Sequence, residues 1–283
     1  MIKFFFLAIL LTFSAIADSN TLPKTLAVPG GIIQIPLGSL SQPAPQAFFQ
    51  QHRVLVTADE HHWLALVGIP LEATPGDHEL IVKSQEKTNR IRFEVRYKEY
   101  PAQYLTIKNK RMVNPEEEDL VRINADSQQI NQAIVTWTEQ PGVETDFKAP
   151  VEGRLSGVFG SRRFFNKQAK NPHSGLDIAA PAGTAIKAPA TAKVINTGNY
   201  YYNGNAVFLD HGQGLITGYF HMTKINVKPG QSVNQGEVLG TVGATGRATG
   251  PHLHWNVYLN GTKVDPALFI AKDLPRLNAR NRK

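Results

Sequence analysis

The chain has 283 residues, which is long enough for two modest domains. It contains no cysteine, so disulfides, thiolate metal ligands and a lipid-modified N-terminal cysteine are excluded, and any metal site must use nitrogen and oxygen atoms. The formal net charge is +7 and the pI is about 9.5, which favours anionic partners. No nucleic-acid-binding motif accompanies this charge, so we expect no nucleic-acid partner.

The N-terminus predicts export. Lys3 precedes an apolar run over residues 4–13, and Ala15-Ile16-Ala17 provides a small-x-small cleavage site. The run is short for a membrane span, so an uncleaved anchor is the minor alternative. We therefore expect residues 1–17 to be a signal peptide, with no stable membrane insertion after its removal, and the mature chain to be periplasmic or secreted.

Residues 18–97 predict a β-rich accessory domain. Runs rich in β-branched and aromatic residues occur over 31–35, 53–56, 63–67 and 91–95, and turn signals such as Pro75-Gly76-Asp77 separate them. We expect a small β-sandwich, for which an immunoglobulin-like arrangement is one option. Because no cluster of catalytic residue types occurs here, the domain is expected to position the protein, bind substrate, regulate the chain or serve a purely structural role.

Residues 98–147 predict a helical connector and a linker. Asn114 is a suitable N-cap, Pro115 fits the first turn, and the acids at 116–118 lie at the positive end of the helix dipole. Apolar side chains then recur at helical spacing at Leu120, Ile123, Ile130, Ile134 and Trp137. We expect this stripe to pack against one or both domains and Pro141-Gly142 to end the helix.

Residues 148–270 are almost wholly β in pattern, and a basic tail follows over 271–283. The strand candidates are residues 192–196, 206–210, 215–221, 237–242 and 252–259. Rigid strands joined by glycine turns suit a preformed cleft. The chain as a whole is therefore predicted to be mainly β, and its tail to be either a solvated segment or a contact for anionic surfaces.

Two motifs in this C-terminal part contain the ligand types of a hydrolytic zinc site. They are Pro251-His252-Leu253-His254-Trp255 and, far upstream, Pro172-His173-Ser174-Gly175-Leu176-Asp177. A catalytic zinc needs three nitrogen or oxygen ligands and an open position for water. On a strand, His252 and His254 would share one face. Pro172 and Gly175 argue against a helix, so we place His173 and Asp177 on a loop that leads into a strand.

The remaining histidines and glycines have simpler interpretations, with one exception. His221 closes the predicted strand 215–221 and is a natural third imidazole near the pair. We interpret His52, His61, His62, His78 and His211 as surface or hydrogen-bonded core residues. The glycine-rich run 240–250 lacks the Gly-Lys-Ser/Thr ending of a phosphate-binding loop, so we expect it to give space for an extended peptide beside the cleft.

Several separate segments, in this order, resemble the signature of lysostaphin-type (LytM-type) zinc endopeptidases, which cleave peptide cross-links in peptidoglycan. The segments are His173-Ser174-Gly175-Leu176-Asp177, Gly218-Tyr219-Phe220-His221, Gly243-Ala244-Thr245-Gly246 and Gly250-Pro251-His252-Leu253-His254. The resemblance covers residues 148–270 and implies a β-rich, lysostaphin-like metallopeptidase domain.

This resemblance implies a site and a function. One Zn²⁺ would be held by His173, Asp177 and His254, and zinc-activated water would attack peptidoglycan stem peptides. His252 would be the principal general base, and His221 would orient water or stabilise the transition state. A wall substrate favours the periplasm. The alternative is a catalytically inactive relative that binds and activates another wall hydrolase, and a regulatory partner is left open. Because all five residues are present, the enzyme is favoured.

The chain departs from the family pattern at two places. Relatives often use a tyrosine shortly before the first histidine ligand to polarise the scissile carbonyl, but residues 160–172 contain none. The replacement donor is left open among Arg162, Arg163, Asn166 and Asn171. Trp255-Asn256 stands where many relatives have Phe-Glu, and because a large aromatic is kept, we expect the ligand geometry to be unchanged.

Overall fold

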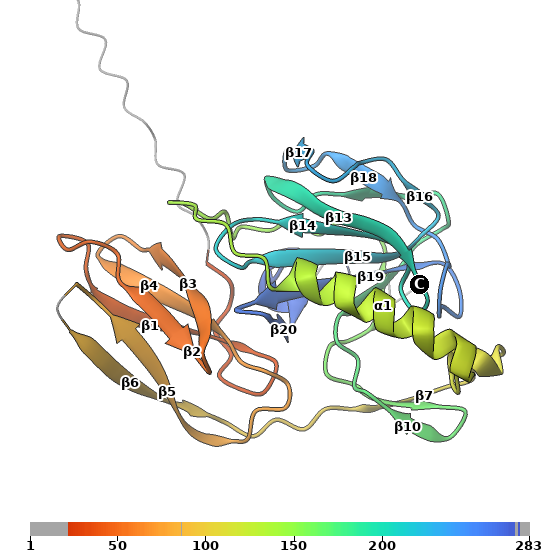
Figure 1. The fold of residues 1–283 in the computed structure, drawn as a ribbon, viewed down its shortest axis with the longest axis horizontal. Helices are drawn as coiled ribbons and strands as arrows, with labels where there is room; N and C mark the ends of the chain where they lie inside the picture. The colour runs from red at the N-terminus through yellow and green to blue at the C-terminus, as the bar shows by residue number, and fades with distance from the viewer. Residues whose placement is uncertain (1–21, 86, 275–276, 278–283) are drawn as a thin grey trace, which may run out of the picture.

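The computed structural model describes residues 22–85, 87–274 and 277, and shows two β-rich halves, with a long helix lying against the C-terminal one (Figure 1). The predicted signal peptide and most of the predicted basic tail lie outside the described residues. In the part that is described, no helix has both the length and the apolar character needed to cross a bilayer. The predicted fold class, mainly β with a connecting helix, is confirmed.

The N-terminal half is a six-stranded antiparallel sheet with the order β1-β4-β3-β2-β5-β6. Its strands are β1 (Ile32–Ser39), β2 (Gln46–Phe49), β3 (His52–Ala58), β4 (His62–Gly68), β5 (Gly76–Lys83) and β6 (Thr88–Val95). The first residues of β3 pair with β2 and the last ones with β4, so the sheet folds over at this strand. Phe49, Leu80 and Phe93 are buried between the layers. The predicted sandwich is therefore one sheet folded on itself.

The connector does not run directly from this domain to the helix. It first forms β7 (Ala102–Leu105), which pairs in parallel with β9 (Arg162–Phe165), and β9 in turn pairs with β10 (Gln168–Lys170). A 3-10 turn, η1 (Lys110–Met112), then leads to the helix. The sequence pattern did not indicate β7. Its consequence is that the connector forms part of the C-terminal half.

The helix α1 spans Glu117–Ile134, so both of its predicted ends are wrong. Glu116, not Asn114, is the N-cap, because its backbone N–H donates to the Asp119 carboxylate at 3.0 Å. Trp137 lies beyond the last helical residue, and the Arg53 guanidinium packs 4.5 Å from the centre of its ring. Trp137 therefore contacts the N-terminal half and does not extend the helical stripe.

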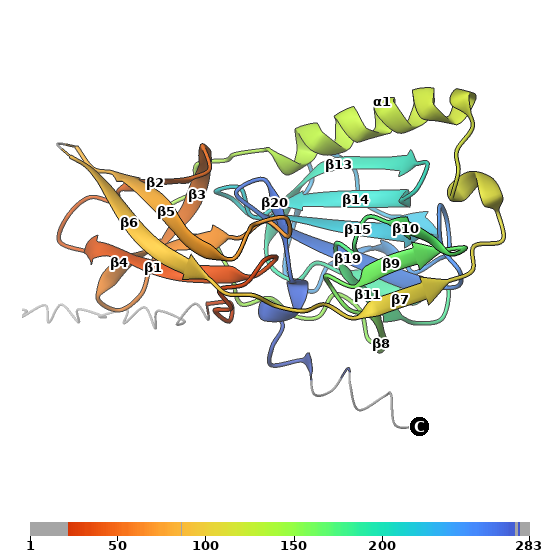
Figure 2. The same ribbon diagram turned by 90° about the horizontal axis from the view of Figure 1, so that it is seen from below.

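The apolar side chains of α1 that pack on the C-terminal sheet lie in the second half of the helix, whereas Arg122 in the first half donates hydrogen bonds to Asn199 of β13. The helix lies along this sheet, next to β13 (Figure 2). Ile130, Ala133 and Ile134 pack with the buried aromatic cluster of that face. Leu120 and Val121, in contrast, are exposed. The predicted stripe is thus a packing surface over its C-terminal part alone.

The C-terminal half contains an eight-stranded sheet in the order β17-β13-β14-β15-β19-β11-β8, with β20 added to β19. These strands are β8 (Arg154–Gly157), β11 (Leu176–Ala179), β13 (Ala192–Tyr200), β14 (Gly204–Asp210), β15 (Ile216–Met222), β17 (Ser232–Val233), β19 (His252–Leu259) and β20 (Thr262–Val264), followed by the 3-10 turn η2 (Pro266–Leu268). A smaller sheet contains β12 (Ala185–Lys187), β18 (Val238–Thr241) and β16 (Lys224–Ile225). All five strands predicted in this half are present.

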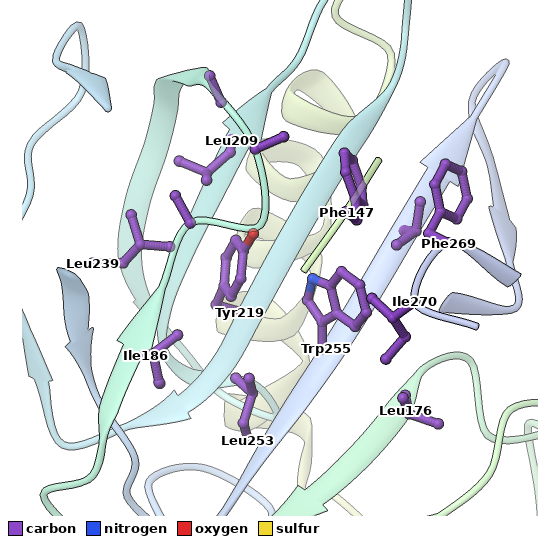
Figure 3. Packing of buried hydrophobic residues seen from close by; sticks show 14 of the residues in the cluster. Phe147, Leu176, Ile186, Leu209, Tyr219, Leu239, Leu253, Trp255, Phe269 and Ile270 are labelled. Atoms are coloured by element: carbon purple, nitrogen blue, oxygen red, sulfur yellow. The ribbon is translucent and has the colours of Figure 1, made fainter. Parts of the chain in front are cut away.

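Both faces of the large sheet are covered, because α1 packs on one face and the small sheet on the other. Tyr219, Leu253 and Trp255 lie in the core between the sheets, where Ile186 and Leu239 of the small sheet meet them (Figure 3). Residues of β15 are consequently buried without interruption. This core gives the ends of β11 and β19 a rigid base.

The N-terminal half docks at one end of β19. Asn260, which follows this strand, accepts the Gly68 N–H at 2.7 Å and donates to the Gly68 carbonyl at 3.1 Å, and both bonds are buried. His252 begins β19 at the opposite end. Since a strand rises roughly 3.3 Å per residue, the run from His252 to Asn260 places this docking point about 26 Å from the histidine end. The N-terminal sandwich therefore does not cover the histidines.

Candidate metal centre

The two sequence motifs meet on adjacent strands. β11 and β19 pair antiparallel, with Asp177 opposite His254 and Ala179 opposite His252. Asp177 therefore lies on a strand and not on the loop predicted for it, because Leu176 and Ile178 on either side are buried in the core in the alternation of a strand. His173 does lie on the preceding loop, where its N–H donates to the Ser161 carbonyl at 2.8 Å.

Three side-chain atoms form a tight triangle. His173 Nε2 lies 3.0 Å from Asp177 Oδ1 and 3.0 Å from His254 Nδ1, and the latter two atoms are 2.7 Å apart. All three residues are buried. His173 Nδ1 lies 2.8 Å from the Val158 carbonyl and must donate to it, so Nε2 of the neutral ring is an acceptor.

The donor set suits a divalent cation. The acceptor lone pairs of His173 and Asp177 converge on the same point, and a cation shared between them would satisfy both. Burial lowers the pKa of His254 to about 4, so this ring is neutral and able to bind a metal. Burial raises the pKa of Asp177, but hydrogen bonds with the two histidines outweigh it and hold the pKa well below its usual range. Two imidazoles and a carboxylate are ligands that zinc takes in open catalytic sites.

Two glycines allow the strands and the loop to approach this triangle. Gly157 of β8 lies opposite Asp177, and a β-carbon there would be 2.4 Å from Asp177 Oδ2. At Gly175 a β-carbon would be 2.7 Å from His254 Nε2. Any larger residue at these positions would have to displace a side chain of the triangle.

His252 and His221 lie beside the triangle, with their ring planes tilted by 47° to each other. Their rings are 4.8 Å apart between centroids. His252 Nδ1 donates to the Gly250 carbonyl and His221 Nδ1 to the Thr245 carbonyl, each at 2.8 Å. Each neutral ring therefore keeps its lone pair on Nε2, and that of His252 lies 3.8 Å from Asp177 Oδ1.

The backbone at His221 is unusual. Its φ is 63°, a left-handed value that is costly for a residue with a β-carbon. Burial, together with the neighbouring His252, lowers its pKa to about 3, so the ring is uncharged. The strained backbone aims this imidazole from the end of β15 toward the pair on β19.

Of the four candidate donors named from the sequence, Arg163 reaches the triangle. Its Nη2 donates to Asp177 Oδ2 at 2.9 Å, and its side chain is 17% exposed. Arg162 is exposed. Asn166 hydrogen-bonds the backbone N–H and carbonyl of Ile107, and Asn171 lies exposed at the rim.

The cleft continues on both sides of the histidines. Two adjoining cavities, of about 750 and 300 Å³, share the lining residues Arg163, Phe165, His221, Arg247 and His254. The connector supplies part of their walls, with Val113 and Pro115 in the first and Gln103, Leu105 and Ile107 in the second. Arg247 was not predicted from the sequence, although it is the single charged residue within the glycine-rich run 240–250.

The other histidines lie as predicted. His211 is a buried core residue that contacts the Thr191 carbonyl at 3.1 Å and Thr217 Oγ1 at 2.9 Å. His52, His61 and His62 are exposed, and His78 is half-buried on the N-terminal sandwich.

Comparisons with known proteins find two family models along the chain. A model described as peptidase family M23 matches residues 171–266, and one described as peptidase family M23 N-terminal domain matches residues 25–98. A crystal structure of a putative peptidase M23 from Pseudomonas aeruginosa is 43% identical, covers 87% of this chain and 96% of its own, and superposes with a TM-score of 0.73.

Curated relatives match over a shorter segment. The peptidoglycan DD-endopeptidase ShyA of Vibrio cholerae is 41% identical over 113 residues, which are 40% of this chain and 26% of ShyA. The DD-carboxypeptidase/endopeptidase Mpg of Neisseria meningitidis is 40% identical over 124 residues, which are 44% of this chain and 28% of Mpg. The chain thus spans about a quarter of the length of these relatives.

Proposed function

The chain belongs to peptidase family M23, and on that premise we propose that it is a zinc-dependent endopeptidase that hydrolyses peptide cross-links of peptidoglycan in the periplasm. The observation that carries the proposal is the convergence of His173, Asp177 and His254 beside two further imidazoles. The names of ShyA and Mpg support a wall peptide as substrate, and a scissile bond between two D-configured residues.

His173, Asp177 and His254 are the residues that would hold the zinc ion. When bound, such an ion polarises a carbonyl group and makes water acidic enough to lose a proton near neutral pH. Arg163 is a positioning residue, because its bond to Oδ2 leaves Oδ1 of Asp177 directed at the two histidines.

His252 is the proposed general base. The Gly250 carbonyl holds its Nδ1 proton, so the Nε2 lone pair faces the cleft and can accept a proton from the attacking water. The water oxygen then bonds to the carbonyl carbon, the carbon–nitrogen bond breaks, and the departing amine takes up a proton. His221, fixed in the same tautomer by Thr245, has the supporting role of orienting water or stabilising developing charge.

The test is to incubate purified residues 18–283 with peptidoglycan, with and without a chelator, and to identify released fragments by mass spectrometry. We expect chelator-sensitive release by the wild type and none by His254→Ala. His52→Ala, which changes an exposed histidine on the N-terminal sandwich, is the matched control and should behave as wild type.

Circular dichroism and metal analysis of each variant separate loss of zinc from loss of fold. If the wild type releases no more than His254→Ala and ignores the chelator, the enzyme proposal is wrong. Stimulation of a second wall hydrolase by that inactive protein would then support the activator alternative.

A further inference from the structure

Arg247 is a half-buried cation in the wall of the cleft that contains the proposed metal ligands. Its guanidinium lies 4.2 Å from the ring centre of Tyr202 and 5.0 Å from that of Phe165. Its Nη1 donates to the Met112 carbonyl at 3.2 Å. Because two aromatic rings and a main-chain carbonyl hold the group, its donors keep a fixed direction.

The charge of Arg247 has no acidic partner among the described residues. A guanidinium has five N–H donors, and its only side-chain hydrogen bond in the described structure goes to Met112. The one carboxylate of the cleft wall, Asp177, is bound by Arg163 and by the two histidines. Burial and the nearby Arg163 charge lower the pKa of Arg247, which reflects the cost of a cation without a counter-charge. Such a group is suited to an anionic ligand.

We propose that Arg247 determines specificity by binding a substrate carboxylate on the carbon that bears the scissile nitrogen. This inference rests on the proposed peptidase function. In an amide substrate, the acyl residue has already used its own carboxyl group as the scissile carbonyl. On the amine side, an α-amino acid leaves a free carboxylate two bonds from the scissile nitrogen. That carboxylate is therefore the one held closest to the reacting atoms.

The proposal defines a substrate class. Favoured amides would have an α-amino acid with a free carboxylate as their leaving amine, either as a C-terminal residue or as a diamino acid cross-linked through an α-amine. Cross-links through the side-chain amine of a lysine, or through a residue within a peptide bridge, lack an anion at this position. Arg247 would give them no charge-assisted bond.

A pair of synthetic substrates tests the proposal. N-acyl-D-alanyl-D-alanine has the free carboxylate, and its C-terminal carboxamide differs only in lacking that charge. We expect kcat/KM of the zinc-loaded wild type to favour the carboxylate by about 30- to 100-fold, the usual range for a charge-assisted pair. Arg247→Gln should reduce this preference to less than about threefold, and Arg247→Lys should restore part of it.

Arg162→Gln is the matched control, because it removes an equal charge from the exposed face of β9, outside the cleft. It should keep the wild-type preference. A second measurement, calorimetric binding of both peptides to metal-free protein, does not depend on turnover. Tighter binding of the carboxylate peptide that is lost in Arg247→Gln is expected there as well.

The outcomes separate this inference from the proposed function. If the wild type hydrolyses peptidoglycan but treats the two peptides alike, the inference is overturned and the peptidase proposal stands. It is also overturned if Arg247→Gln slows both peptides equally, since the residue then only shapes the cleft. If the wild type hydrolyses nothing, the peptidase proposal fails and the binding preference alone decides whether Arg247 recognises a carboxylate.

Discussion

Alanine at Gly157 should weaken metal binding without unfolding the protein. The added β-carbon would lie 2.4 Å from Asp177 Oδ2, whereas ordinary contacts begin at 3.4 Å, so the carboxylate must move by about 1 Å. Metal–ligand bonds tolerate deviations of only about 0.2 Å. The displaced carboxylate would therefore be lost as a ligand. The binding free energy of a zinc ion held by four ligands is roughly 10–16 kcal/mol, so an equal share for one ligand is about 3 kcal/mol. Loss of that share weakens zinc binding by about 100-fold in Kd.

The assay is zinc affinity by competition with a chromophoric chelator, with the fold checked by thermal unfolding. Gly250→Ala is the control, since this glycine also borders the cleft but a β-carbon there meets nothing within 4 Å. Neither glycine has a positive φ, so backbone strain does not separate the two variants. Equal zinc affinity in Gly157→Ala and Gly250→Ala would refute the reasoning that Asp177 is a ligand held in place by its cross-strand neighbour.

Three further outcomes are expected. His252→Gln should keep its zinc in metal analysis but lose about 10²- to 10⁴-fold in kcat, and a loss of zinc instead would count against its role as base. Burial lowers the pKa of His211 from 6.5 to about 4. Between these two pH values the unfolded chain binds more protons than the folded protein, so the contribution of His211 to the free energy of unfolding falls by about 3 kcal/mol as the pH drops through the interval. His211→Asn should reduce the slope of the urea-unfolding profile against pH in that interval, and an unchanged slope would contradict the assignment. Asn260→Ala should cost about 2–4 kcal/mol in the same assay because the buried N–H and carbonyl of Gly68 lose their partners, whereas the exposed Asn124→Ala should cost almost nothing.

Local patterns were sufficient for much of this protein. The alternation of a strand predicts that His252 and His254 share a face, and Leu253 between them is buried in the core on the other side. The β-branched and aromatic runs predict the main strands of both halves. The helix was predicted from its apolar spacing, but its ends were not. At the N-terminal end, Arg111 and the backbone of Glu116 hydrogen-bond Asp119, and this places the N-cap two residues after the predicted one.

The amino-acid sequence by itself determined the chemistry available: histidine and aspartate in place of cysteine, a strand pair of imidazoles, and glycines where chains must approach. Only the tertiary structure decided which of these groups meet. Three features join residues that are far apart in the chain: the register that places Asp177 opposite His254, the connector strand β7 along the cleft, and the two aromatic rings that pack against Arg247. Pairing of distant strands is selected by burial of the whole core, and no local pattern of residues contains that information.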